Sequence, residues 1–95
     1  MTPEDRRIRA TAAKHLLEDP LFVEAWDAVN AHLVQQTLTC SSDDAQKALR
    51  IVISQQLLAA VKREITRIVQ DGVVAEVQIS ELNSKRNVVQ RILQR

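Results

Sequence analysis

The chain has 95 residues and a net charge of +1, and it contains one glycine, two prolines, one phenylalanine and one tryptophan. A chain of this length forms one domain with a modest core, and so little glycine and proline excludes a turn-rich all-β fold. The near-neutral charge argues against a dedicated nucleic-acid-binding protein, which usually carries a strong basic excess. We therefore expect a single all-α domain spanning residues 1–95.

Cysteine usage and hydropathy bear on the compartment. Cys40 is the only cysteine, so no internal disulfide can form, and a reducing compartment is the simplest expectation. No apolar run approaches the roughly 20 residues that a membrane-spanning helix needs, and the N-terminus lacks the apolar core of a signal peptide. The sequence predicts a cytoplasmic protein without a membrane partner.

An N-terminal helix is predicted over about residues 3–17. Thr2 is placed to cap it, and Pro3 fits the first helical position, where its missing N–H is not needed. Two acids then follow at the positive end of the helix dipole. Apolar residues recur at a spacing of four, at Ile8, Ala12 and Leu16.

A second helix is predicted over about residues 20–37. Asp19 and Pro20 repeat the signal of a cap followed by a proline. One face of this helix is apolar and aromatic, as expected of a packing face. It is formed by Phe22, Trp26, Val29 and Leu33.

A third helix is predicted over about residues 43–71. The hydroxyl-rich stretch before it favours a turn, with Ser42 as the expected cap. No glycine or proline interrupts the helical spacing until Gly72. Glycine is the residue expected just beyond a helix end, so Gly72 is predicted to stop the helix, with Val73 packing back on the last turn.

The second and third helices are predicted to form an antiparallel hairpin because their charges are opposite. Residues 18–44 carry six acids and no Lys or Arg, whereas residues 45–70 carry five bases and one acid. The two stretches therefore stand at −6 and +4. Neighbouring helices of opposite sign, joined by a short polar turn, are expected to fold back on each other.

The segment after Gly72 carries two competing patterns. Apolar residues alternate like a strand over residues 73–79, whereas the spacing over residues 82–93 fits a helix. A lone strand is not stable, so a separate, mobile C-terminal helix is expected, capped by Ser80 or Ser84. Residues 73–95 are interpreted as a partner-binding tail.

No catalytic, cofactor or metal site is predicted. Cys40, Ser41 or Ser42 with His15 or His32 could supply a nucleophile and a base, but hydroxyls before two acids at a helix start are far more often caps. One glycine excludes a glycine-rich phosphate loop, and the histidines and cysteine do not form a recognised metal-ligand pattern. We expect a non-enzymatic protein without cofactors.

Protein–protein interaction is the leading hypothesis for function. The third helix is about ten residues longer than the second and carries apolar residues outside its main stripe, which favours a homo-oligomer or a larger protein partner. The alternative is a small regulator that binds nucleic acid or a host protein through its basic termini or its acidic second helix. The predicted interaction residues are Ile51, Leu58, Val61, Ile65, Arg86, Val89, Arg91, Ile92 and Arg95.

A family resemblance bears on the same question. It rests on the run from Leu16 to Phe22, on Ala25 and Trp26 in the next helix, and on the Ser41–Asp44 turn before a long helix and Gly72. This pattern, over about residues 16–75, resembles small helical proteins encoded near the structural genes of tailed bacteriophages and prophages. The resemblance implies a phage-type assembly protein, adaptor or virion component, located in the host cytoplasm or the virion and lacking catalytic residues.

Overall fold

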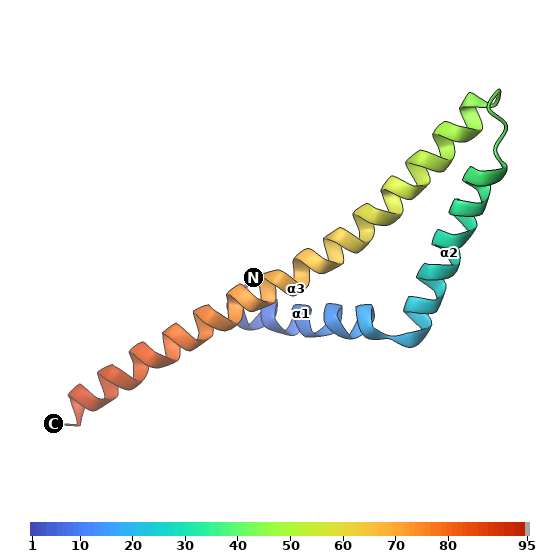
Figure 1. Ribbon diagram of the computed structural model, residues 1–95. Coiled ribbons are helices and arrows are strands. Elements are labelled where there is room, and N and C mark those ends of the chain that lie inside the picture. The colour runs from blue at the N-terminus through green and yellow to red at the C-terminus, as the bar shows by residue number, and fades with distance from the viewer. Residues whose placement is uncertain (95) are drawn as a thin grey trace. The chain divides into compact units, whose positions relative to one another are not determined.

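The computed structural model describes residues 1–94 and contains three helices over that part of the chain. They are α1 (Pro3–Glu18), α2 (Pro20–Thr39) and α3 (Ala45–Leu93), drawn from blue to red in Figure 1. The predicted all-α class is confirmed, and the first two predicted helices are correct to within two residues at each end. The third predicted helix ends far too early.

Side-chain caps begin α1 and α2 as predicted. The Thr2 Oγ1 accepts a hydrogen bond from the Asp5 backbone N–H at 3.1 Å, and the Asp5 carboxylate accepts one from the Thr2 N at 3.3 Å. This reciprocal pair is a capping box with aspartate in the third position. Asp19 has an extended backbone, and its Oδ1 accepts a hydrogen bond from the Phe22 N–H at 2.9 Å. The bend between α1 and α2 is therefore fixed by Asp19 and the proline that follows it.

The link between α2 and α3 is capped differently from the prediction. The Asp44 Oδ1 accepts a hydrogen bond from the Lys47 N–H at 3.0 Å, so Asp44 is the cap and the predicted cap Ser42 is wrong. Because α3 begins at Ala45, a side chain at position 42 is two residues too early to reach its first free N–H groups. Cys40 lies partly exposed in this link, with its Sγ directed at the Ser41 and Asp44 carbonyls.

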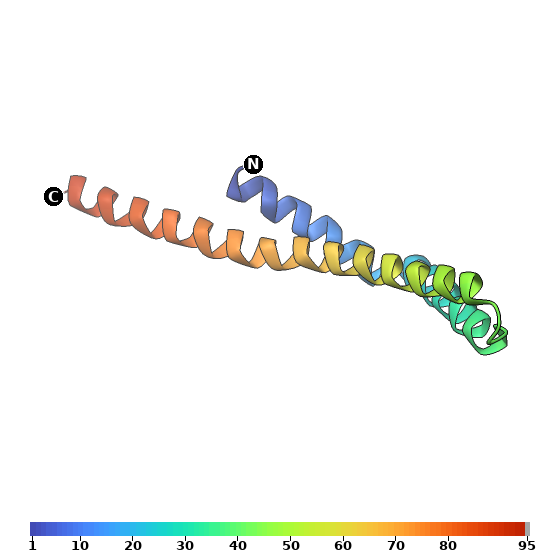
Figure 2. The ribbon, with the colours of Figure 1, turned by 90° about the horizontal axis from the view of Figure 1, so that it is seen from above.

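Gly72 does not end α3. The helix continues as one unbroken element to Leu93, and both views of the ribbon show it so (Figures 1 and 2). No glycine has a positive φ among the described residues, so the predicted left-handed stop at Gly72 is wrong. The separate, mobile C-terminal helix predicted after it is wrong as well, because residues 73–93 belong to α3. Apolar residues recur at every second position over residues 73–79 because they lie on several sides of this helix.

Two compact units make up the chain. Unit 1 comprises Met1–Lys14 and Thr66–Arg95, so α1 packs on the later part of α3. Its buried core is built from small residues, with Ala10, Ala13, Gly72 and Ala75 all nearly inaccessible. A Cβ added to Gly72 would collide with the Cβ of Ala10, so the two backbones meet where neither side chain is larger than a methyl group. Gly72 is needed for this close helix crossing rather than for a helix end.

An ion pair and a hydrogen bond, both formed by Arg6, join α1 to α3 beside the crossing in unit 1. The Arg6 guanidinium forms an ion pair with the Asp71 carboxylate, with Nη2 to Oδ1 at 2.6 Å and Nε to Oδ2 at 3.0 Å. The remaining Nη1 donates to the Gln78 Oε1 at 2.8 Å. A bidentate guanidinium–carboxylate pair fixes direction as well as distance, so it sets the register of α1 along α3.

Unit 2 comprises His15–Ile65 and contains the predicted hairpin of α2, the link and the first part of α3. Leu33 and Ile51 are its buried aliphatic residues, 8% and 5% exposed. Phe22 and Trp26 are partly buried, and their ring centroids lie 5.6 Å apart. Trp26 therefore lies on the packing side of α2, as its position in the apolar face predicts.

Candidate interaction surfaces

An apolar groove lies between α2 and α3 in unit 2. It has a volume of about 450 Å³ and is open to solvent. Its walls are aliphatic apart from one serine, and that hydroxyl is satisfied because the Ser54 Oγ donates to the Arg50 carbonyl at 2.8 Å. We call this feature the apolar groove; its lining residues are Val29, Leu33, Ser54, Leu57, Leu58 and Val61.

Burial differs between neighbouring residues of the groove walls. Leu33 is buried, whereas Val29 is 48% exposed and Leu57 is 63% exposed. The apolar surface of the walls is therefore only partly covered by the hairpin itself. Apolar side chains at positions i and i+4 share a helix face, so Val29 with Leu33 on one wall faces Leu57 and Val61 on the other. A groove of this kind accepts an apolar ridge from another helix.

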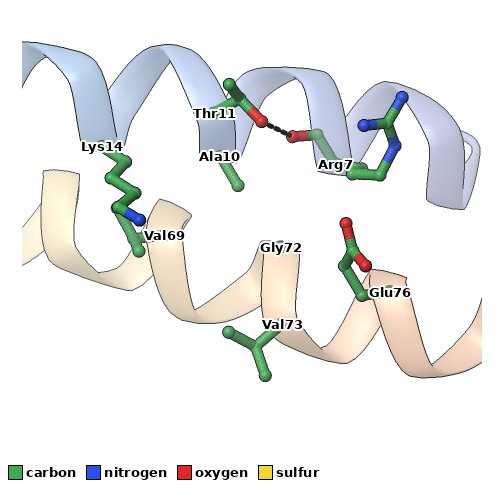
Figure 3. Close-up of a pocket in the computed structure, with 8 residues that line it drawn as sticks. All are labelled: Arg7, Ala10, Thr11, Lys14, Val69, Gly72, Val73 and Glu76. Carbon is green, nitrogen blue, oxygen red and sulfur yellow. Dashed lines mark hydrogen bonds between the residues drawn. The ribbon is translucent and has the colours of Figure 1, made fainter.

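A smaller notch flanks the helix crossing in unit 1 (Figure 3). It has a volume of about 150 Å³, and in Figure 3 Ala10 points toward Gly72 while Glu76 is directed toward Arg7. Arg7 also pairs with Glu4, and this hydrogen bond, followed by the charges of Glu4 and Glu76, raises the pKa of Arg7. Acids therefore lie beside Arg7, one of the two basic residues that line the notch; the other is Lys14.

The last part of α3, residues 80–93, forms a third surface, which we call the C-terminal arm. Every described side chain in the arm is exposed. Its aliphatic residues continue a seven-residue repeat along α3, which positions Ile68, Ala75, Leu82 and Val89 on one face. Ile68 and Ala75 are at least partly buried in unit 1, whereas Leu82 is 58% and Val89 53% exposed. The arm therefore carries the same apolar face without a covering helix.

The predicted interaction residues fall into three groups. Leu58 and Val61 line the apolar groove, and Ile65 is partly buried beyond it. Ile51 was expected on an open surface but is only 5% exposed, so it belongs to the packing of the hairpin. The exposed members on the C-terminal arm are Arg86, Val89, Arg91 and Ile92, and Arg95 lies outside the described residues.

The groove includes residues that the sequence predicts only as a packing face. The spacing of Val29 and Leu33 predicts that they pack against another helix, but not that they line a groove open to solvent. Their apolar spacing identifies the face of each helix, but the angle between the helices decides whether that face is closed or open. No residue pattern in the chain signals that angle.

The side chains of Cys40, Ser41 and His32, three of the candidate catalytic residues, contact groups other than one another. The Sγ of Cys40 is directed at backbone carbonyls, and the Ser41 Oγ accepts a hydrogen bond from the Asp43 N–H at 3.3 Å. A His32 ring nitrogen lies 3.1 Å from the Gln36 amide nitrogen. Within residues 1–94, no three His, Cys, Asp or Glu side chains gather as metal ligands would. In the same part of the chain, no helix combines the length and apolar character needed to cross a membrane.

Comparison with known proteins adds no relative. No protein-family model matches the sequence, and neither a curated protein nor a solved structure matches the chain. The three surfaces described above are therefore interpreted from their geometry and charge.

Proposed function

We propose that this protein is a non-enzymatic assembly or adaptor protein that acts through helix–helix contacts with copies of itself or with a larger protein. The observation that carries the proposal is the apolar groove, a solvent-open cleft of about 450 Å³ with aliphatic walls. Large apolar clefts on a small protein mark interaction sites, because leaving them in water is unfavourable.

Exposed apolar side chains in both units support the proposal. In unit 2, Val29 is 48% and Leu57 63% exposed, and in unit 1, Leu82 is 58% and Val89 53% exposed. Contact with another protein would remove these side chains from water, which is favourable.

The proposal includes a specific biological setting. The resemblance to small helical proteins of tailed bacteriophages is consistent with a role in particle assembly or as a virion component. Such roles require surfaces for binding other proteins rather than a reaction centre. The groove and the arm are surfaces of that type.

Light scattering coupled to size-exclusion chromatography tests the proposal. At about 50 μM, a concentration at which weak micromolar interfaces are largely occupied, we expect a mass of at least two copies of the 10.7 kDa chain. A mass of one copy, together with no binding to candidate virion proteins, would overturn it. A shift assay with duplex DNA at two salt concentrations tests the alternative, because phosphate contacts predict a steep loss of affinity with salt.

A further inference from the structure

An exposed aliphatic ridge on α3 borders the apolar groove. Its centre is Leu57, which lines the groove and is 63% exposed. At about 100° per residue on an ideal helix, Ile53 and Val61 lie about 40° to either side of Leu57. They are 45% and 52% exposed. We call the side of α3 that carries these three residues the groove face.

Most charged residues of the hairpin lie on its other sides. Around the axis of α3, Lys62 and Arg63 are about 140° and 120° away from Leu57. Around the axis of α2, Asp27 is about 160° away from Val29, and it lines a different pocket together with Lys62. These charges would therefore not stand between two copies that meet at their groove faces.

Two opposite charges mark the ends of the groove face. Arg50 precedes Leu57 by seven residues, and Glu64 follows it by seven. Each therefore lies about 20° around the helix and about 10.5 Å along it from Leu57. Both residues are exposed. The groove face is thus positive at one end, aliphatic in the middle and negative at the other end.

This order of charges makes the groove face complementary to a second copy of itself. Because Arg50 and Glu64 are equally distant from Leu57, antiparallel pairing about Leu57 places each Arg50 beside the Glu64 of the other copy. Glu64 takes part in an interaction within its own chain, but a carboxylate accepts several hydrogen bonds and can bind a further guanidinium. Parallel pairing would instead place like charges side by side.

We infer that two copies of this protein pair through their groove faces as an antiparallel dimer, with a two-fold axis beside Leu57. This inference rests on the proposed function and names the partner as a second copy of the chain. In the dimer, Leu57 of each copy covers the groove of the other, which removes aliphatic surface from water. The contact is isologous, so association through this surface stops at two copies.

Charge reversal at the ends of the groove face tests the antiparallel arrangement. Arg50→Glu brings two carboxylates together at each end of the dimer, and Glu64→Arg brings two guanidinium groups together. Each single variant should raise the dissociation constant of the dimer by about tenfold, measured by sedimentation equilibrium. The double variant restores opposite charges at both ends, so its dissociation constant should return to that of the natural chain.

Mixing the two single variants is the decisive measurement. In a mixed dimer every end contact again joins a carboxylate to a guanidinium, so we expect 1:1 pairing with about the natural dissociation constant. Arg63→Glu is the matched control, because it changes the net charge as much as Arg50→Glu does but lies about 120° around the helix from Leu57. It should leave the dissociation constant unchanged.

Leu57→Arg tests the centre of the interface. It places two bases together at the two-fold axis and should raise the dissociation constant by roughly tenfold to a hundredfold. Val52→Arg is its control, since Val52 is 47% exposed but lies about 140° around the helix from Leu57. Circular dichroism checks that each variant keeps the helix content of the natural chain, and Leu57→Gln replaces Leu57→Arg if it does not.

The results separate this dimer from the proposed function. Self-association that survives Leu57→Arg, single reversals without effect, or a double variant that stays weakened would each overturn the antiparallel dimer while leaving the assembly function standing. A natural chain that is monomeric at every concentration also overturns the dimer. If candidate virion proteins do not bind that monomer either, the proposed function falls with it.

Discussion

Replacing Gly72 with alanine tests the close crossing of α1 and α3 in unit 1. In a solvent-exposed helix, Gly→Ala stabilises by about 1 kcal/mol because glycine is a poor helix former. Here the added Cβ would collide with the Cβ of Ala10, which is fixed to the backbone and cannot rotate away. Because carbon atoms need about 3.5 Å, the helices must separate and the small-residue core of unit 1 must open.

The size of the effect follows from these opposed terms. Overpacking a close contact costs about 1–3 kcal/mol, and the upper part of this range applies where the neighbour is rigid. After subtracting the gain of about 1 kcal/mol in helix propensity, Gly72→Ala should destabilise the protein by about 1–2 kcal/mol. Urea unfolding followed by circular dichroism measures this value, and hydrogen exchange locates the loss in α1.

A compensating substitution provides the control. In Ala10→Gly with Gly72→Ala, the new Cβ would have the residue-10 Cα at 3.5 Å and the Arg6 carbonyl oxygen at 3.8 Å, both ordinary contacts. One glycine is exchanged for another, so the free energy of unfolding should return to within about 1 kcal/mol of the natural chain. Ala10→Gly alone should cost about 1–2 kcal/mol. A stabilising Gly72→Ala, or a double variant that shows only the sum of the two losses, would refute the crossing.

Further predictions concern the caps and the ion pair. Asp19→Ala and Asp44→Ala should each lower the free energy of unfolding by about 1 kcal/mol, because each removes an N-cap. Ser42→Ala should leave the free energy of unfolding unchanged, and thermal melts of the three variants test the difference. The second prediction concerns pH: the Arg6 guanidinium lowers the pKa of Asp71 below its ordinary 3.8. The stability due to this pair is therefore complete above that ordinary value and lost as the pH falls through the lower folded pKa. Asp71→Asn should flatten that acid decline in unfolding experiments.

Local sequence was sufficient for the helix starts of α1 and α2. Thr2 and Asp19 cap them because a short oxygen-bearing side chain before a proline can do little else at a helix start. The third cap was misplaced by two residues because Ser42 and Asp44 are both good caps and lie in the same short link. The choice between them depends on where the backbone turns, which the cap residues alone do not decide.

Gly72 shows the limit of local patterns more clearly. Glycine is found both beyond helix ends and where two helices cross closely. The residue that decides between these roles is Ala10, which is distant in the sequence and adjacent in space. Likewise, the spacing of Val29 and Leu33 identifies an apolar face, but the open groove depends on how far α2 and α3 separate. Both features arise from packing between segments, so a reading of each segment by itself misses them.

The link that carries Cys40 has a practical consequence. The chain has a single thiol, and it lies partly exposed in the link of the α2–α3 hairpin. A fluorophore attached there would label every molecule at one site without any engineered mutation. Because emission depends on the surroundings of the dye, binding of another protein at this end of the hairpin would change the signal.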